Sequence, residues 1–215
     1  MTIWSVVPLK SFKRPKSRLN DSLSLEQRRI LVKTMFKDIM NEQKKCKLFT
    51  KRMVVSEDKD VIKFAKAFGV DGLLQRKPGL NQGISQIAEL AKKKKIQTLL
   101  IIHGDVPRVD KTILKLILTK HKKLIKNSKK GVTLVPDTLG EGTNCMICSP
   151  PNIIKFRYGP GSCLAHLEEA YNANVKCQIY RSKKLAMDID KDVDLNSFLK
   201  KKGFLSVDDY FSKKL

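Results

Sequence analysis

A basic loop follows the first apolar segment of the chain. Ile3 to Val7 is rich in β-branched residues, and Lys10 to Arg18 then carries five cationic side chains within nine positions. If the apolar segment is a strand of a parallel sheet, this loop lies at the strand's carboxyl end. Its charges and backbone N–H groups could then hold a triphosphate. An ordinary exposed basic loop is the alternative, because lysine is abundant along the whole chain.

Three aspartates follow apolar segments elsewhere. Asp105 follows the run Thr98 to Ile102, and Asp188 and Asp190 follow Leu185 to Met187. Carboxylates at strand ends can jointly hold Mg²⁺, which prefers one or two protein carboxylates together with substrate phosphates. If the segment around Leu185 is a strand, Asp188 and Asp190 point to the same face. Turn-forming or helix-capping aspartates are the alternative for each one taken singly.

Two glycine-rich turns complete the candidate chemistry, at 140–144 and 157–162. Glycine lets a backbone approach a ligand closely, and Ser162, at the start of a predicted helix, offers N–H groups and a hydroxyl to an anion. A plain turn with a helix cap is the alternative. Cys145 and Cys148 do not predict a zinc site, because an offset of three on a strand puts the two thiols on opposite faces. His103 and His121 have no nearby Ser or Cys pattern typical of a nucleophile.

The elements that must position these residues alternate along the chain. Apolar runs predict strands at 3–7, 53–55, 70–74, 98–102 and 132–135, and helical spacing predicts helices at about 24–43, 61–68, 81–91, 113–124 and 163–173. Asn81 is the expected cap of the third of these helices. The fold class is therefore α/β, a three-layer α/β/α arrangement with a mostly parallel sheet in a single domain over 1–215. Such sheets bind ligands beyond the carboxyl ends of their strands.

The charge narrows the class of partners. Lysine and arginine number 44 against 21 acidic residues, a net charge of +23, yet only nine of the 44 are arginines. Because base recognition and stacking favour arginine, specific nucleic-acid binding is not expected, although the field draws in anionic metabolites. A basic RNA-binding protein is the alternative from another class. The apolar runs are too short to span a membrane, and five scattered cysteines predict reduced thiols in the cytoplasm.

Six motifs in one order carry a resemblance to a known family. They are VVPLK followed by PKSRL, LN at 80–81, GDVP at 104–107, VPDxxGxGTN at 135–144, YGPGS at 158–162, and DIDxxxDL at 188–195. This pattern resembles the 2-phospho-L-lactate guanylyltransferases of deazaflavin coenzyme F-420 biosynthesis, which are MobA-like nucleotidyltransferases. One departure is Lys191-Asp192, where the family usually has Thr-Pro.

The resemblance implies a nucleotide-diphospho-sugar transferase-like fold, a homodimer, and transfer of GMP from GTP to the phosphate of a three-carbon acid, with Mg²⁺ as cofactor. That acid would be 2-phospho-L-lactate, phosphoenolpyruvate or 3-phospho-D-glycerate; a MobA-like enzyme for molybdopterin or a sugar phosphate is the alternative. The implied roles are as follows: Lys10, Lys16 and Arg18 on the triphosphate, Asn81 near the guanine or ribose, Asp105 with Asp190 or else Asp188 on the metal, and Thr143, Gly159, Ser162 and Arg157 on the acid.

Overall fold

Seven apolar strands form one sheet at the centre of the protein. The computed structural model describes residues 1–202 and 210–211, and the strand order is β3-β2-β1-β4-β6-β5-β7. The strands are β1 (Ile3–Pro8), β2 (Lys51–Ser56), β3 (Asp71–Leu74), β4 (Thr98–Ile102), β5 (Gly131–Pro136), β6 (Thr143–Ser149) and β7 (Cys177–Ile179). The first five coincide closely with the predicted runs.

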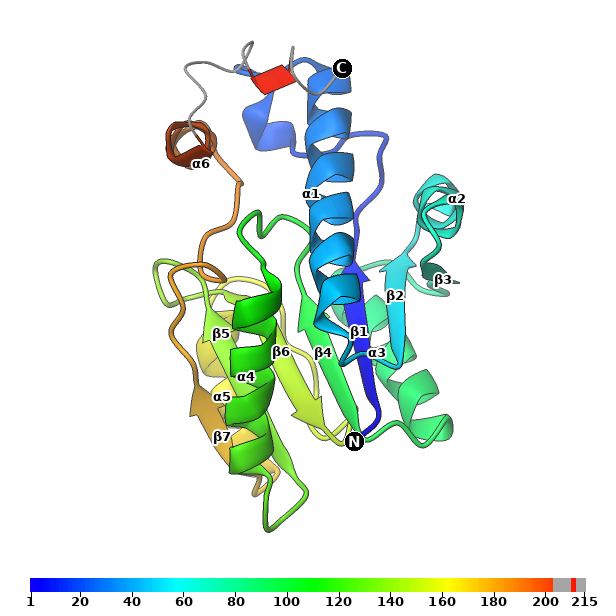
Figure 1. Cartoon of the computed structure of the whole chain (residues 1–215), viewed down its shortest axis with the longest axis vertical. Helices are drawn as coiled ribbons and strands as arrows, with labels where there is room; N and C mark the ends of the chain where they lie inside the picture. Colours follow the sequence, from blue (N-terminus) through cyan, green and yellow to red (C-terminus); the bar gives the residue numbers. More distant parts are fainter. Residues whose placement is uncertain (203–209, 212–215) are drawn as a thin grey trace.

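The sheet is mostly parallel, as predicted, with one exception. Strand β6 runs antiparallel to both of its neighbours, β4 and β5, and in Figure 1 its arrow points opposite to that of β1. The reason is the short link from β5 to β6, because a parallel crossover needs a dozen or more residues. In that link Asp137 accepts hydrogen bonds from the backbone N–H groups of Gly140, Glu141 and Gly142. The VPDxxGxG motif is thus a hairpin turn.

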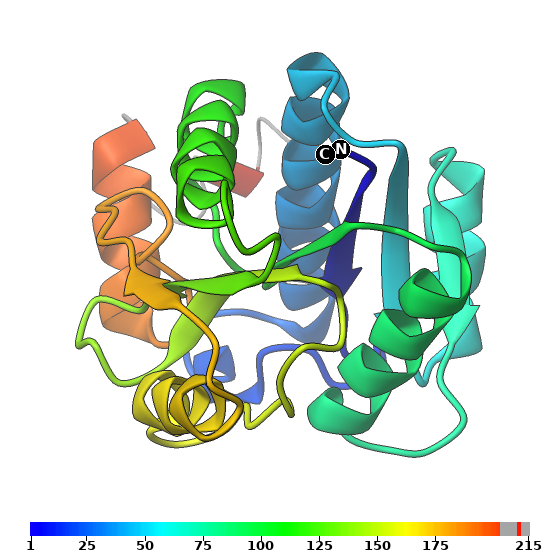
Figure 2. The ribbon, with the colours of Figure 1, turned by 90° about the horizontal axis from the view of Figure 1, so that it is seen from below.

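Helices cover both faces of the sheet. They are α1 (Leu25–Cys46), α2 (Lys59–Ala67), α3 (Leu80–Lys93), α4 (Lys111–Leu124), α5 (Ser162–Asn172) and α6 (Asp192–Lys202), with a short 3₁₀ helix at Ser17–Leu19. The apolar sides of α1, α2, α4 and α6 pack in one core layer, and those of α3 and α5 pack in the other, which gives the three layers of Figure 2.

Two buried cysteines lie in different core layers, and one buried histidine joins a helix to the sheet. Cys145 lies in the layer of α1 and α4, whereas Cys148 lies in the layer of α3 and α5, so the two thiols are on opposite faces as expected. The His121 ring is fully buried and bonds Thr133 Oγ1 at 2.8 Å and Ser149 Oγ at 2.9 Å. This histidine ties α4 to the sheet.

Two local predictions were wrong. Asn81 does not cap α3: the cap is Gly79, with φ of 100°, and Asn81 is already within the helix. The segment around Leu185 is not a strand but a turn, in which the Ala186 N–H donates to the Ser182 carbonyl at 2.8 Å.

All parallel strands end at one edge of the sheet, which is the upper edge in Figure 1. Strand β6 begins at that same edge because it runs the other way. Loops after Pro8, Ile102 and Pro136 therefore meet the start of β6 there. Among the described residues, no helix has the length and apolarity that crossing a bilayer requires.

Candidate functional site

Lys16 lies at the centre of a charged cluster at the strand-end edge. Its ammonium Nζ lies 2.7 Å from Asp105 Oδ2 and 3.4 Å from Asp190 Oδ1, and the guanidinium of Arg18 also pairs with Asp190. Lys16 follows β1 and Asp105 follows β4, and these adjacent strands lead to opposite halves of the sheet order. This is the topological switch point, where α/β sheets bind their ligands.

Hydrogen bonds from a buried arginine side chain to backbone carbonyls hold the basic loop in place. Arg28, on α1, donates from Nε to the Pro15 carbonyl at 3.0 Å and from a terminal nitrogen to the Leu23 carbonyl at 2.6 Å. Only 9% of Arg28 is exposed. Lys16 itself has φ of 48° and ψ of 52°, a left-handed conformation that side-chain-bearing residues seldom adopt. The loop thus fixes an uncommon backbone shape that turns Lys16 toward the carboxylates.

Hydrogen bonds from Ile189 and Asn144 hold the segment that carries Asp188 and Asp190. The Ile189 N–H donates to the Asp105 carbonyl at 3.1 Å. Asn144 Nδ2 donates to the carbonyls of Leu185 at 3.2 Å and Ala186 at 2.8 Å. These bonds replace the strand pairing that was expected, and they place this distant segment directly beside the end of β4.

A third anchor stabilises the turn after Asp190. The carboxylate of Asp194 accepts hydrogen bonds from the N–H groups of Asp190, at 3.1 Å, and Lys191, at 2.8 Å. Sequence reasoning assigned no role to Asn144, Asp194 or Arg28; the first two belong to the GTN and DIDxxxDL motifs, which were the available signal.

The electrostatics of the cluster follow from burial and proximity. Burial opposes the charge on Lys16, but the carboxylates of Asp105, Asp190 and Asp188 together outweigh it, and the pKa of Lys16 is raised. Burial likewise opposes ionisation of Asp105, but Lys16, His103 and the hydrogen bonds to Asp105 together outweigh it, and the pKa of Asp105 is lowered. Burial, helped by the charge of Asp105, raises the pKa of Asp188 to about 6. Lys16 therefore interacts electrostatically with Asp105, Asp190 and Asp188.

The cluster has spare capacity for a ligand. Asp105 Oδ1 is buried and has no hydrogen-bond partner among the described residues. Within residues 1–202 and 210–211, no group of three or more His, Cys, Asp or Glu side chains forms a ready metal cage. The Lys16 ammonium lies between two of the carboxylates, so a cation and this lysine compete for the same oxygens.

A second group of predicted residues surrounds His166, on α5. Thr143 Oγ1 lies 3.1 Å from His166 Nδ1 and 3.4 Å from Ser162 Oγ, and the Arg157 N–H lies 2.9 Å from His166 Nε2. The Arg157 guanidinium points elsewhere, 3.9 Å from Glu169. Burial lowers the pKa of His166 to about 4, so its ring is neutral at pH 7.

The turn before α5 adopts backbone shapes that favour glycine. Gly159 has φ of 144° and Gly161 has φ of 67°, and nothing would collide with a Cβ at either position. The requirement is therefore conformational. Asn81 holds this turn from α3, donating to the Tyr158 carbonyl at 2.9 Å and accepting from the Tyr158 N–H at 2.7 Å.

The two groups are adjacent. The Tyr158 ring lies 5.0 Å from the ring of His103, two residues before Asp105, and 4.7 Å from the ring of His166. The structure therefore brings together the predicted residues of the charged cluster, which are Lys16, Arg18, Asp105, Asp188 and Asp190. Beside this cluster lie Thr143, Ser162 and the backbone of Arg157. Asn81 and Gly159 shape the adjoining turn. Lys10 is exposed, with its charge felt by His103.

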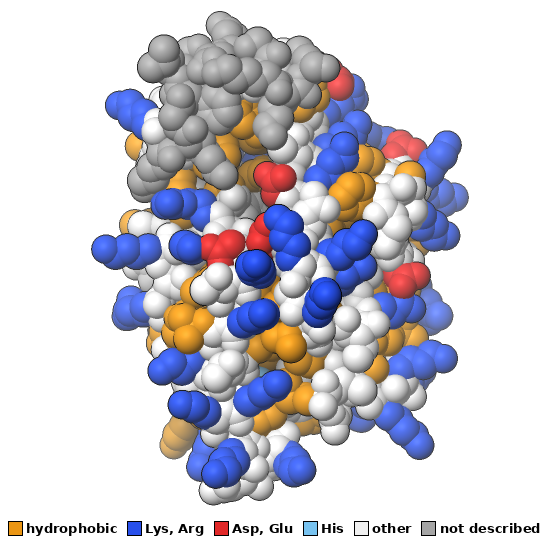
Figure 3. All heavy atoms as spheres, viewed as in Figure 1, with side chains coloured by type: hydrophobic (Ala, Val, Ile, Leu, Met, Phe, Trp, Pro, Cys, Tyr) orange, Lys and Arg blue, Asp and Glu red, His pale blue; other side chains and the backbone are white. Residues whose placement is uncertain are grey.

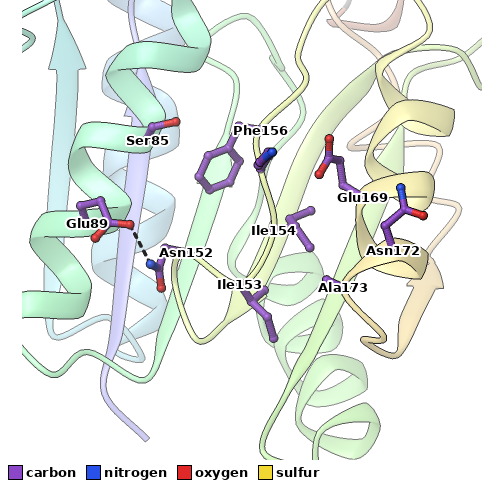
Figure 4. A pocket seen from close by; sticks show the side chains of 10 residues that line it. Ser85, Glu89, Asn152, Ile153, Ile154, Phe156, Glu169, Asn172 and Ala173 are labelled. Carbon is purple, nitrogen blue, oxygen red and sulfur yellow. Dashed lines mark hydrogen bonds between the residues drawn. The ribbon is translucent and has the colours of Figure 1, made fainter.

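Cationic side chains surround the acidic ones, which suits an anionic ligand. Figure 3, viewed as in Figure 1, shows acidic side chains near the middle of the molecule with lysine and arginine side chains around them. By contrast, a surface hollow of about 420 Å³ lies between α3 and α5, lined by residues such as Glu89, Asn152 and Phe156 (Figure 4). None of the predicted site residues lines this hollow, so it does not coincide with the charged cluster.

Solved structures share this fold. A protein from Desulfovibrio desulfuricans, provisionally named a nucleotide-diphospho-sugar transferase, superposes with a TM-score of 0.76 at 13% identity, covering 97% of this chain and 91% of that one. A cytidylyltransferase from Leptospira borgpetersenii gives a TM-score of 0.61 at 16% identity, covering 96% and 89%. The protein thus has the nucleotide-diphospho-sugar transferase-like fold, with a charged site at its switch point.

Residues 3–212 match the family model described as guanylyl transferase CofC like, and the chain belongs to that family. It is therefore a guanylyltransferase. The 2-phospho-L-lactate guanylyltransferase of Methanobrevibacter smithii is 30% identical over 198 residues, covering 92% of this chain and 84% of that one. The 3-phospho-D-glycerate guanylyltransferase of Colwellia psychrerythraea is 31% identical, covering 88% of each, and the phosphoenolpyruvate guanylyltransferase of Sphaerobacter thermophilus is 29% identical, covering 91% of each.

Proposed function

We propose that this protein transfers GMP from GTP to the phosphate of a three-carbon acid and releases pyrophosphate, as a step of coenzyme F-420 biosynthesis. The observation that supports it best is the contact of Lys16 with both Asp105 and Asp190. Three segments far apart in the sequence supply a cation and two carboxylates at the switch point, which suits a site where a triphosphate meets a second anion. The named relatives use phospholactate, phosphoglycerate or phosphoenolpyruvate, and the acceptor here is one of these.

The proposed roles follow the two groups of residues. Lys16 and Arg18, with Lys10 at the rim, bind the triphosphate, because they are the cations at the end of β1. The acid binds against Thr143 and Ser162, with Arg157 and the backbone at Gly159 nearby. Asn81, which binds the backbone of Tyr158, lies near the guanine or ribose.

The carboxylates fit Mg²⁺. Their oxygens are the hard ligands that this ion prefers, and the unpaired, buried Oδ1 of Asp105 is a ligand atom that lacks its partner. Asp105 and Asp190 would hold the ion, with Asp188 beside them. When bound, Mg²⁺ supplies positive charge that offsets the repulsion between the triphosphate and the acceptor.

The chemistry asks little of the protein beyond positioning. The acceptor phosphate is largely a dianion at pH 7, its second pKa being about 6, so it can attack the α-phosphorus of GTP without a general base. Burial lowers the pKa of His166 to about 4, which makes its ring a weak base, and the proposed reaction needs none. The lysine and arginine side chains align the two anions and stabilise the charge on the departing pyrophosphate.

One assay tests the proposal. The pure protein is incubated with GTP, Mg²⁺ and each of the three acids in turn, pyrophosphate is measured, and the next enzyme of the pathway is added to trap unstable product. Release with one of the acids, and its loss on chelation of Mg²⁺, is the expected result. Release only with molybdopterin or a sugar phosphate would replace the acceptor, and no release with any acceptor would refute the proposal.

All five cysteines are free thiols, which supports a reducing cytoplasmic location. A homodimer is implied by the family resemblance, and sedimentation equilibrium of the pure protein tests it.

A further inference from the structure

His166 connects the turn before α5 to the first residue of β6. Its ring is fully buried, and both ring nitrogens have partners. The Arg157 N–H lies 2.9 Å from Nε2, and Thr143 Oγ1 lies 3.1 Å from Nδ1. Neither contact was expected from the sequence, and no step of the proposed reaction uses this ring.

The two contacts fix which nitrogen carries the proton. A backbone N–H can only donate, so Nε2 must offer its lone pair to the Arg157 N–H. In a neutral imidazole the proton then sits on Nδ1. The Nδ1–H faces both Thr143 Oγ1, at 3.1 Å, and the backbone carbonyl of Ser162, so Thr143 cannot donate back to the ring.

One hydroxyl group of the Thr143 and Ser162 pair remains a hydrogen-bond donor without an acceptor among the described residues. The Ser162 hydroxyl donates to Thr143 Oγ1 at 3.4 Å. The Thr143 O–H has no acceptor among the described residues. Even if the bond between the two hydroxyls reverses, one O–H of the pair still lacks an acceptor. In every arrangement that keeps the Nδ1–H tautomer, the pair presents a hydrogen-bond donor.

We infer that His166 is a positioning residue that holds the Thr143 and Ser162 pair as a hydrogen-bond donor for the acceptor substrate. The inference rests on the proposed function, in which this pair contacts the acid. It adds a selection rule: the subsite takes a group that only accepts hydrogen bonds, such as an ionised carboxylate or phosphate oxygen. The opposite tautomer would turn Thr143 toward the ring and remove that donor.

The tautomer is measurable without activity. Two-dimensional ¹⁵N–¹H spectra of the wild-type protein at pH 7 distinguish a protonated from an unprotonated nitrogen in each of its three histidines, which are assigned through space. The expected result for His166 is a protonated Nδ1 and a bare Nε2. A protonated Nε2, or a charged ring, would overturn the inference whatever the enzyme does.

A double-mutant cycle tests whether His166 acts through Thr143. His166→Gln and Thr143→Val are each expected to raise KM for the acid by about 10- to 100-fold, the value of one hydrogen bond to a charged group, with KM for GTP unchanged. The double variant is expected to be no worse than either single variant, because both changes remove the same donor. Additive losses would contradict the inference.

A matched control separates positioning from simple support of the fold. His121→Gln also removes a buried histidine that bonds two hydroxyl groups, but in the core beside Ser149. It is expected to lower thermal stability and leave KM for the acid unchanged. If it raises that KM as much as His166→Gln does, the effect is structural and the inference fails. If the wild-type enzyme transfers GMP to no acid, the proposed function fails, while the tautomer is still decided by the spectra.

Discussion

Replacing Asp105 by asparagine removes one negative charge from the centre of the cluster with almost no change in volume. At 2.7 Å and an effective dielectric constant of about 20, its attraction to Lys16 is about 6 kcal/mol. Loss of hydration on burial offsets most of that attraction. The asparagine oxygen can still accept from the lysine, so the net loss of folding stability is about 2 kcal/mol. For a domain of this size, this corresponds to a fall in Tm of about 4 to 8 °C.

The expected loss of activity is far larger. Asp105 supplies a buried, unpaired oxygen and the charge that orients Lys16, so kcat for pyrophosphate release should fall by at least about 10³-fold. The assay is pyrophosphate release with GTP, Mg²⁺ and the preferred acid, alongside thermal unfolding of the same preparation. The comparison of kcat with Tm separates lost chemistry from lost structure.

Asp71→Asn is the matched control. Asp71 also pairs with a lysine, Lys51, at 3.3 Å, but on the edge strand β3 and with more than half of its side chain exposed. It should change Tm by about 2 °C or less and leave kcat unchanged. Full activity of Asp105→Asn, or a loss equal to that of Asp71→Asn, would refute the assignment of Asp105.

Three further outcomes are expected. Arg28→Met removes the donors that hold the basic loop and should destabilise the protein by about 2 kcal/mol in urea while raising KM for GTP; an unchanged KM would show that the loop keeps its shape without it. Asn144→Asp places a carboxylate, which can only accept, beside the carbonyls of Leu185 and Ala186; it should lower kcat and destabilise the protein by about 2 kcal/mol. Asn144→Ala should destabilise the protein less, and an equal loss of stability in the two variants would contradict this reasoning. Since burial lowers the pKa of His121 and His166 to about 4, unfolded chains take up more protons below pH 6.5, and stability should fall from pH 6.5 to 4. His121 and His166 each contribute about 3 kcal/mol to that fall, the lowered pKa of His103 adds to it, and the raised pKa of Asp188 offsets part of it, so urea unfolding should show stability falling toward pH 4, and a flat profile would contradict it.

Local patterns predicted most of the fold. The runs at Ile3 and Thr98 are apolar and β-branched, and the helices between them have apolar residues at helical spacing, so strand and helix could be read without tertiary information. The antiparallel direction of β6 was not predicted, although the short link after Pro136 explains it. The segment at Leu185 failed because an alternating apolar pattern predicts extended backbone, while a strand also needs a partner edge, which the sequence does not display.

The candidate site was predicted only in part, because the sequence does not show which distant residues come into contact. Motif order placed Lys16, Asp105 and Asp190 among the candidates, but their contact depends on pairs 89 and 174 residues apart in the chain. The supporting residues Arg28 and Asn144 were missed, because nothing in the sequence shows which backbone carbonyls a side chain will bind.

By itself, the sequence determined the α/β class, the edge of the sheet at which chemistry belongs, and the family through the order of its motifs. Only the tertiary structure decided that one lysine joins two carboxylates and that a buried histidine faces the Thr143 and Ser162 hydroxyls. The physical reason is range. Strand and helix preferences act between near neighbours in the chain, whereas the ionisation of a carboxylate or the tautomer of a ring depends on groups that only folding brings within hydrogen-bond distance.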